Sequence, residues 1–298
     1  MTIAKKRNSL IEFFRFFFAL NVVKNHGYFP YRTHLFSPGR VSVEFFFVLS
    51  GFLLRKSLDK YTRLPYFQGL LLMLKNKVVA LGIPFLIGYF FIITRNYLSG
   101  MDIQKVFVEW GYLWYVFNMF FVDIFYFTVR KFGKSEKWFF IITAVVFVIT
   151  ASAHAIPQCF EWGYLRAFST MSLGILISYI PSIKLKKQWL FIIPVVVLFG
   201  YVLRILLFDF TFIEEEILDL LIYPALIYFT FQLPIHNKVL NYLGALSFGL
   251  YAYQAVPQLL WVYNIGNAWI YFFIIVGLTV LTDAIMRLIR FYKQKQFK

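Results

Sequence analysis

Residues 9–29 read SLIEFFRFFFALNVVKNHGYF, an apolar stretch long enough to cross a membrane that nevertheless carries Glu12, Arg15 and His26. A charged side chain at membrane depth costs a few kcal/mol or more, so it usually marks a functional site. Arg15 and His26 are 11 residues apart, which is about three helical turns and roughly 16 Å along the axis, so both face the same side. The stretch predicts a membrane helix with one polar stripe.

The composition of the whole chain indicates a multi-span membrane protein. Of its 298 residues, 60% are hydrophobic and only 15% are charged, and the mean hydropathy is +0.69. Soluble domains carry about 25% charged residues.

The single cysteine, Cys159, excludes an internal disulfide and a multi-cysteine metal site. His34, His154 and His236 lie in expected loops or at the end of an expected helix, without the spacing of metal ligands, so we predict no metal site.

Apolar stretches separated by turns or charges predict an all-α, polytopic bundle of ten membrane helices. They show no soluble domain or repeat, so we expect a single membrane-embedded domain over residues 1–298. Most stretches reach the length of about 20 residues that a bilayer requires, and the second is short. The expected helices span residues 9–29, 41–56, 76–95, 106–129, 137–154, 163–180, 188–208, 216–233, 239–263 and 268–290.

The net charge of +16 reflects membrane topology. When the N-terminus is placed inside, most of the 30 Lys and Arg residues fall in inside loops, as the positive-inside rule requires, and both termini are cytoplasmic. We therefore expect no nucleic-acid partner.

The first residues, MTIAKKRNSL, have the basic flank of a signal peptide. Glu12 and Arg15 break the apolar core and no small-residue cleavage site follows, so we expect this segment to be retained.

The first two expected helices carry the residues that could perform chemistry. His26 lies near the outer end of the first helix, and Glu44 enters the second helix at about the same depth. A neutral imidazole beside a carboxylate is a general base with an orienting partner, which is the arrangement that activates a hydroxyl nucleophile. Glu12 and Arg15, three residues apart, can form an ion pair within one helix.

Structural interpretations of the same residues remain open. His26 could be an interfacial residue, and the Glu12–Arg15 pair could be a structural bridge between helices. Ser50 and Gly51 could be small residues that allow close helix packing, which is the interpretation that physics alone favours. Asp283, in the last expected span, is interpreted as a helix-packing contact. The residues by themselves therefore predict a membrane protein with a polar site between its first two helices.

Two segments in this region resemble a known family. Arg15 and His26 are separated by ten residues, and Glu12 precedes the arginine by three. The later segment VSVEFFFVLSGFLL, residues 41–54, contains an acidic residue, Glu44, followed by FFVLSGF. In this order and spacing the run resembles acyltransferase family 3, the bacterial membrane acyltransferases that O-acylate sugars and cell-surface glycans. The resemblance places Ser50 in the SGF triplet of that family.

Weaker matches to the same family follow. LWYV, residues 113–116, resembles the tryptophan-containing segment of the fourth helix and marks Trp114 as a supporting residue. LGALSFGLYAYQAVP, residues 243–257, resembles a late family segment, but Gln254 stands where histidine is common. Tyr112 likewise stands where the earlier segment can have histidine.

The resemblance implies an acyl-CoA donor, most often acetyl-CoA, that is reached from the cytoplasm, and no tightly bound cofactor. The stretch LKNKVVALGIPFL keeps the family's Pro84 but lacks its usual preceding arginine. We expect Lys75 and Lys77 to substitute for that arginine as phosphate contacts and Arg55 to contribute from the same cytoplasmic side. The competing interpretation is that these cations only reflect the positive-inside rule.

The implied mechanism has His26 as general base and Glu44 as its orienting acid. His26 would take the proton of an acceptor hydroxyl, while Arg15, positioned by Glu12, would hold the donor or stabilise developing negative charge. We expect Ser50 and Trp114 to support this site. The expected acceptor is a glycan or lipid-linked sugar, and the expected location is the bacterial plasma membrane, in contact with its lipids.

Two alternatives are weighed against an acyltransferase. A transporter or flippase of acyl groups or lipid-linked glycan could use the same interior charges without forming a bond. A non-catalytic scaffold could retain the fold, and Gln254 in place of a histidine gives this alternative some support. Retention of Arg15, His26 and Glu44 argues against the scaffold, because a scaffold does not need buried charge.

Overall fold

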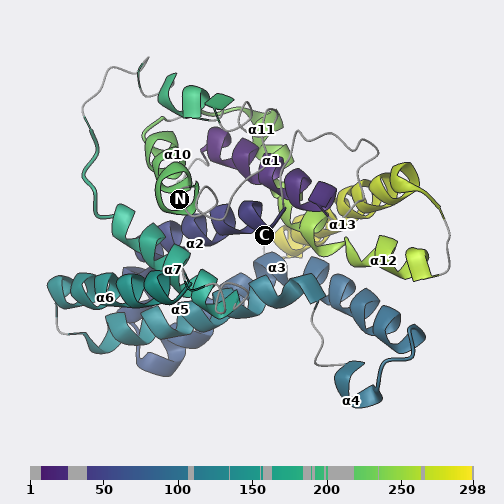
Figure 1. Cartoon of the computed structure of the whole chain (residues 1–298), viewed down its shortest axis with the longest axis horizontal. Helices are drawn as coiled ribbons and strands as arrows, with labels where there is room; N and C mark the ends of the chain where they lie inside the picture. Colours follow the sequence, from purple (N-terminus) through teal and green to yellow (C-terminus); the bar gives the residue numbers. More distant parts are fainter. Residues whose placement is uncertain are drawn as a thin grey trace. The chain divides into compact units, whose positions relative to one another are not determined.

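The structure is a computed structural model, shown in Figure 1. It describes residues 8–25, 39–106, 111–133, 135–154, 156, 163–183, 189, 192–197, 199–200, 218–233, 235–262 and 266–296. Within these residues every regular element is a helix and there is no strand, which confirms the all-α prediction. The chain divides into two compact units. Unit 1 comprises Met1–Thr33, Val79–Leu113 and Ile235–Lys298, and unit 2 comprises His34–Val78 and Trp114–Pro234.

Three of the described helices are long and apolar enough to cross a membrane. They are α3 (Tyr66–Leu98), α6 (Glu136–His154) and residues Ala268–Leu288 of α13 (Ala268–Gln296). Large apolar side chains on them are exposed, including Phe90 and Ile149 at 63% and 61%. Apolar surface of this extent suits contact with lipid tails. The membrane character is therefore confirmed, while the ten-helix topology, the position of the termini and the single domain stay predictions.

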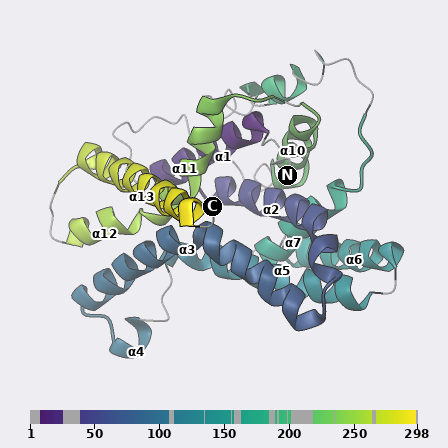
Figure 2. The same cartoon turned by 180° about the vertical axis from the view of Figure 1, so that it is seen from behind.

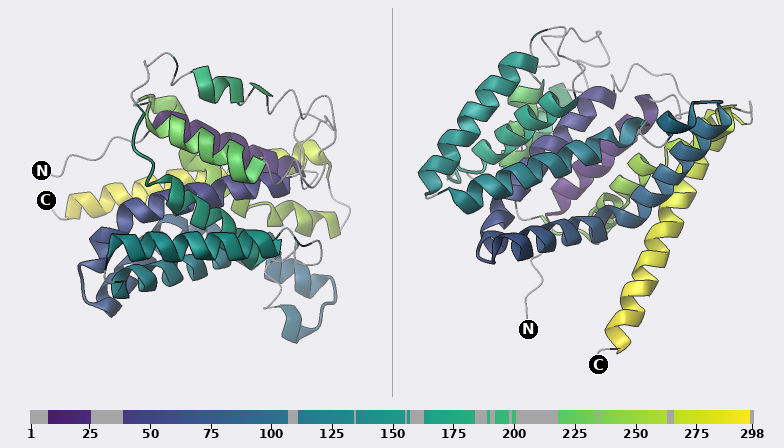
Figure 3. Two further views of the ribbon diagram at one scale, coloured as in Figure 1. Left: turned by 60° about the vertical axis from the view of Figure 1, so that its left-hand side comes forward. Right: turned by 90° about the horizontal axis from the view of Figure 1, so that it is seen from below.

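Unit 1 is built on the close packing of α1 (Ser9–Asn25) against α11 (Lys238–Ala252), which lie side by side in Figure 3. The Ser9 hydroxyl donates to the Asn241 side-chain oxygen at 2.9 Å. Further along, a Cβ atom added to Gly244 would lie 2.7 Å from the Glu12 Cα atom. Glycine at this position thus lets the two helices approach to backbone contact.

The predicted helix 239–263 is wrong in its continuity, because the chain turns at Tyr253 and Gln254 between α11 and α12 (Ala255–Val262). Pro257 explains the break. Its ring would clash with the carbonyl of Tyr253, four residues earlier, and it has no N–H to donate to that carbonyl. The prediction followed the apolar character of the stretch and overlooked this proline.

Unit 2 is centred on α2 (Gly39–Thr62) and α7 (Gly163–Ile177), with α5 (Trp114–Phe132) and α6 packed around α7. These helices can be followed in Figure 2. A Cβ atom on Gly51 would lie 2.0 Å from the Met171 carbonyl oxygen, and one on Gly174 would lie 2.1 Å from the Val48 carbonyl oxygen. The two helices therefore touch backbone to backbone, as the packing interpretation of Gly51 expected.

Gly51→Ala is expected to destabilise the protein, whereas Gly277→Ala in α13 is expected to leave stability unchanged or raise it. Alanine is favoured over glycine in a helix by up to about 1 kcal/mol. At Gly277 nothing lies within 4 Å of the added Cβ atom, but at Gly51 it collides with a backbone carbonyl. Thermal unfolding of both variants in detergent measures the difference. Equal melting temperatures for the two variants would contradict the close contact.

Several helix ends differ from the prediction. The second helix runs to Thr62 instead of residue 56, so it is not short, and its polar end is held by an Arg55–Asp59 pair at 3.4 Å. α3 begins at Tyr66, ten residues before the expected start, and the expected helix 106–129 begins as α5 at Trp114. The prediction 188–208 falls largely outside the described residues.

The remaining boundaries agree closely with the prediction. The expected helices 137–154 and 163–180 correspond to α6 and α7, and 268–290 corresponds to α13. The expected helix 216–233 corresponds to a π-helical turn, Leu218–Ile222, followed by α10 (Tyr223–Phe231).

Candidate functional site

The predicted Glu12–Arg15 pair is present in unit 1. One guanidinium nitrogen of Arg15 donates to Glu12 Oε2 at 2.8 Å. Glu12 is buried beneath α11, at 6% exposure, because Gly244 leaves room for it. The Arg15 side chain is 30% exposed. The pair thus anchors Arg15 on α1 while leaving part of its cationic group accessible.

Arg15 lines a cavity of about 680 Å³, here called the α11–α13 cavity, which lies within unit 1. α1 contributes Arg15, α3 contributes Pro84, α11 contributes Lys238 and Tyr242, and α13 contributes Arg287. The volume is in the range of ligand-binding pockets. The family's proline and arginine positions therefore meet at one cavity, with additional cations around it.

Glu44 is buried in unit 2, at 2% exposure, and its partner is Arg166 of α7. Arg166 Nε donates to Glu44 Oε1 at 2.5 Å, and a second guanidinium nitrogen contacts the same oxygen. The other oxygen, Glu44 Oε2, has no hydrogen-bond partner among the described residues. Arg166 was placed within a span by the sequence but given no role, although a lone arginine in an apolar helix is itself a signal of function.

Trp114 and Ser50 lie in the same unit. The Arg166 guanidinium carbon lies 5.2 Å from the centre of a Trp114 ring, a cation–π contact that covers the buried ion pair. The Ser50 hydroxyl lies 3.5 Å from the Tyr115 hydroxyl. Within unit 2, Arg166 therefore contacts both Glu44 and Trp114. Ser50 contacts Tyr115, the residue that follows Trp114.

The cations predicted to bind the donor have different surroundings. Arg55 contacts Glu136 and donates to the Tyr179 hydroxyl at 3.1 Å. Lys77 pairs with Asp123, which is fully buried. Lys75 is exposed. Arg55 and Lys77 therefore already have protein carboxylates as partners, and sequence reasoning had singled out neither acid.

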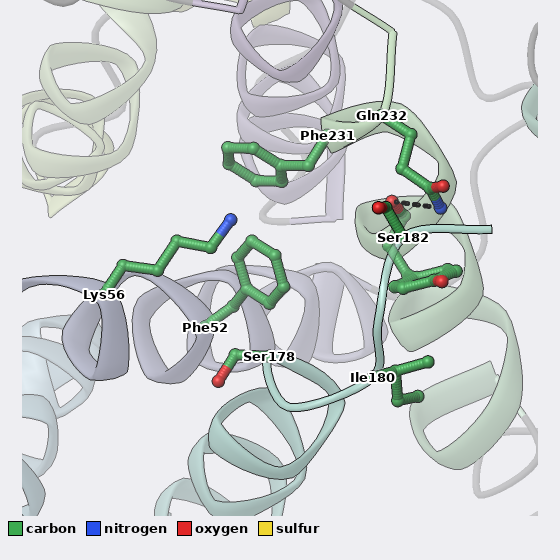
Figure 4. Close-up of a pocket in the computed structure, with 8 residues that line it drawn as sticks. Phe52, Lys56, Ser178, Ile180, Ser182, Phe231 and Gln232 are labelled. Atoms are coloured by element: carbon green, nitrogen blue, oxygen red, sulfur yellow. Dashed lines mark hydrogen bonds between the residues drawn. The ribbon is translucent and has the colours of Figure 1, made fainter. Parts of the chain in front are cut away.

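A smaller pocket of about 340 Å³ in unit 2 lies beside the SGF segment (Figure 4). The Lys56 ammonium lies 4.0 Å from the centre of the Phe52 ring and 4.7 Å from that of Phe231. Ser178 and Ser182 also line this pocket. Phe52 therefore packs against a cation at the end of α2, which gives the third residue of the SGF triplet a structural role.

The other residues singled out by the sequence either lie outside the described part of the chain or have a side chain without a hydrogen-bond partner among the described residues. His26, His34 and Cys159 belong to the first group, so the His26–Glu44 pair stays a prediction. Gln254 is fully buried, and neither atom of its side-chain amide has a hydrogen-bond partner among the described residues. The described residues contain no cluster of His, Cys, Asp and Glu placed to hold a metal ion.

The helices and the buried acid–arginine pairs define an all-helical membrane protein with buried polar sites. The sequence model of the acyltransferase-domain family matches residues 8–287. The chain therefore belongs to acyltransferase family 3 and is a membrane acyltransferase, which confirms the resemblance drawn from Arg15, His26 and Glu44. No curated protein and no solved structure shows significant similarity to the chain.

Proposed function

We propose that the protein is an O-acyltransferase that moves an acyl group, most simply acetyl, from acyl-CoA to a sugar hydroxyl of a cell-surface or exported glycan. One observation carries this proposal: Arg15, held by the buried Glu12, lines the α11–α13 cavity. A concave pocket on which several polar groups converge is typical of a ligand site. Such a cavity suits a donor with a long arm and an anionic end.

In the proposed reaction the acceptor hydroxyl oxygen attacks the thioester carbonyl and loses its proton to His26. The carbon–sulfur bond then breaks, and CoA leaves as the thiol with the proton returned by His26. Arg15 stabilises the negative charge that develops on the carbonyl oxygen, since a fixed cation in a site of low dielectric acts without reorganisation. Glu12 keeps the guanidinium in place.

Glu44 orients the base in this proposal. Its Oε1 atom is taken by Arg166, while Oε2 has no hydrogen-bond partner among the described residues and can accept an imidazole N–H. The proposed location is the bacterial plasma membrane, with acylation at the outer face.

Arg15→Gln is expected to reduce acyl transfer by about 100-fold or more, the loss that follows removal of one group stabilising an oxyanion. The assay is release of free CoA from acetyl-CoA by purified protein in detergent, with and without a glycan extract from its host. Arg63→Gln is the matched control, because Arg63 is exposed. Equal activity of both variants would refute the role of Arg15.

A transporter is the second candidate, and the Lys77–Asp123 pair favours it. Asp123 is fully buried, and its Oδ1 atom has no hydrogen-bond partner among the described residues. Buried charge pairs in membrane helices also serve proton-coupled transport. A transporter would consume no donor, so the CoA-release assay decides between the two candidates.

A further inference from the structure

The α11–α13 cavity is lined by charged residues at one end and by less polar residues of α11 toward the other. The Arg287 guanidinium carbon lies 4.7 Å from the centre of the Tyr242 ring, which joins the start of α11 to the later part of α13. Seven residues further along α11, a Cβ atom on Gly249 would lie 2.7 Å from a Thr279 methyl carbon. The two helices are therefore antiparallel along the cavity.

The polarity of the lining changes along this axis. Lys238 and Tyr242 line the charged end, and four residues place both on one face of α11. Ala245 and Phe248 continue the same lining toward Gly249. The distance along the helix from Lys238 to Gly249 is about 16 Å at 1.5 Å per residue. The cavity thus suits a long molecule with an anionic end and a less polar arm.

Asp283 occupies the charged end as an internal anion. Its Oδ2 atom accepts a hydrogen bond from Arg287 Nε at 2.7 Å. The Asp283 side chain is 20% exposed and the Arg287 side chain is 56% exposed, so the guanidinium remains open to a ligand. A phosphate carries more charge than a carboxylate and binds arginine through two parallel hydrogen bonds. It can therefore displace the weaker internal partner.

We propose that Lys238 and Arg287 bind the phosphate groups of the acyl-CoA donor at the charged end of the α11–α13 cavity. This inference rests on the proposed function. Tyr242 positions the Arg287 guanidinium through their cation–π contact, and Asp283 is the counter-anion that donor phosphate replaces. The acyl arm then extends along Ala245 toward Gly249. Sequence reasoning assigned the donor phosphates to Arg55, Lys75 and Lys77 instead.

The test compares donors that differ in their phosphates. The Michaelis constant is measured with acetyl-CoA, with acetyl-dephospho-CoA and with acetyl-pantetheine, which lacks the nucleotide and its phosphates. Arg287→Gln and Lys238→Gln are expected to raise KM for acetyl-CoA by about 10-fold to 100-fold, the loss of one charge-assisted contact, with little change in kcat. Neither should change KM for acetyl-pantetheine. Asp283→Asn should lower KM for acetyl-CoA.

Exposed Lys105→Gln is the matched control and should change no constant. The double variant Asp283→Asn with Arg287→Gln removes both charges of the pair and so keeps the charge balance. Because it lacks the Arg287 guanidinium, its KM for acetyl-CoA should stay raised, as in Arg287→Gln alone. Unchanged KM for acetyl-CoA in the Arg287 and Lys238 variants would overturn the inference.

Binding of free CoA and of dephospho-CoA, measured by calorimetry, separates this inference from the proposed function. Suppose that the wild type binds CoA, that Arg287→Gln binds it more weakly, and that the wild type transfers no acyl group. This result supports the phosphate site and refutes the proposed reaction. Absence of CoA binding by the folded wild type refutes both.

Discussion

His26→Ala is expected to abolish acyl transfer while leaving folded protein in normal yield. A positioned general base contributes about 100-fold to 10,000-fold in rate, and alanine can neither take the hydroxyl proton nor return it to the leaving thiolate. Free CoA released from acetyl-CoA in the presence of glycan acceptor is the measurement. His26→Gln provides a second variant, since it keeps a polar side chain but cannot act as a base at neutral pH.

The matched control for this experiment is His236→Ala. His236 is exposed and lies just before α11, and the mechanism gives it no role. Its variant should retain wild-type activity. If His26→Ala transferred acyl groups at the wild-type rate, the base would have to be another residue and the proposed mechanism would be wrong.

Arg166→Gln is expected to cost about 3 to 5 kcal/mol of stability, because it leaves the buried Glu44 carboxylate without its counter-charge. Both side chains are nearly inaccessible, at 5% and 2% exposure, so water cannot replace the lost partner. Thermal or denaturant unfolding in detergent measures the change. Glu44→Gln alone should also destabilise the protein, since it leaves the arginine unpaired.

The double variant Glu44→Gln with Arg166→Gln separates structure from catalysis. Removal of both charges should recover much of the stability lost in each single variant, since neither charge is left buried alone. If Glu44 orients His26, the recovered protein remains inactive. A stable double variant with wild-type activity would show that the pair is only a structural bridge between α2 and α7.

Sequence reasoning located most helices because apolar stretches of membrane length are visible in one dimension. It misplaced the end of α2, where polar residues continue the helix and contribute no apolar signal, and it left out the apolar start of α3, residues 66–75. It also missed the turn at Tyr253 and Gln254, although Pro257 marks it. Local stereochemistry would have corrected that prediction, whereas the polar end of α2 is also held by an ion pair with a distant segment, Arg130 with Asp59 at 2.9 Å.

The candidate site was predictable only where its residues are close in sequence. The Glu12–Arg15 pair followed from a spacing of three residues and is present. The Glu44–Arg166 pair joins residues 122 positions apart, so no local pattern could reveal it. Asp283, interpreted as a helix-packing contact, instead pairs with Arg287 one turn along its own helix and faces a cavity.

The separation between Glu44 and Arg166 also constrains how the chain is made. A ribosome completes α2 long before it reaches α7, so the Glu44 carboxylate is made well before its guanidinium partner. A buried charge without a partner is costly, and until Arg166 arrives Glu44 must therefore be kept near water. Nascent chains that end before α7 lack this counter-charge, so the Glu44–Arg166 pair can form only after α7 has been synthesised.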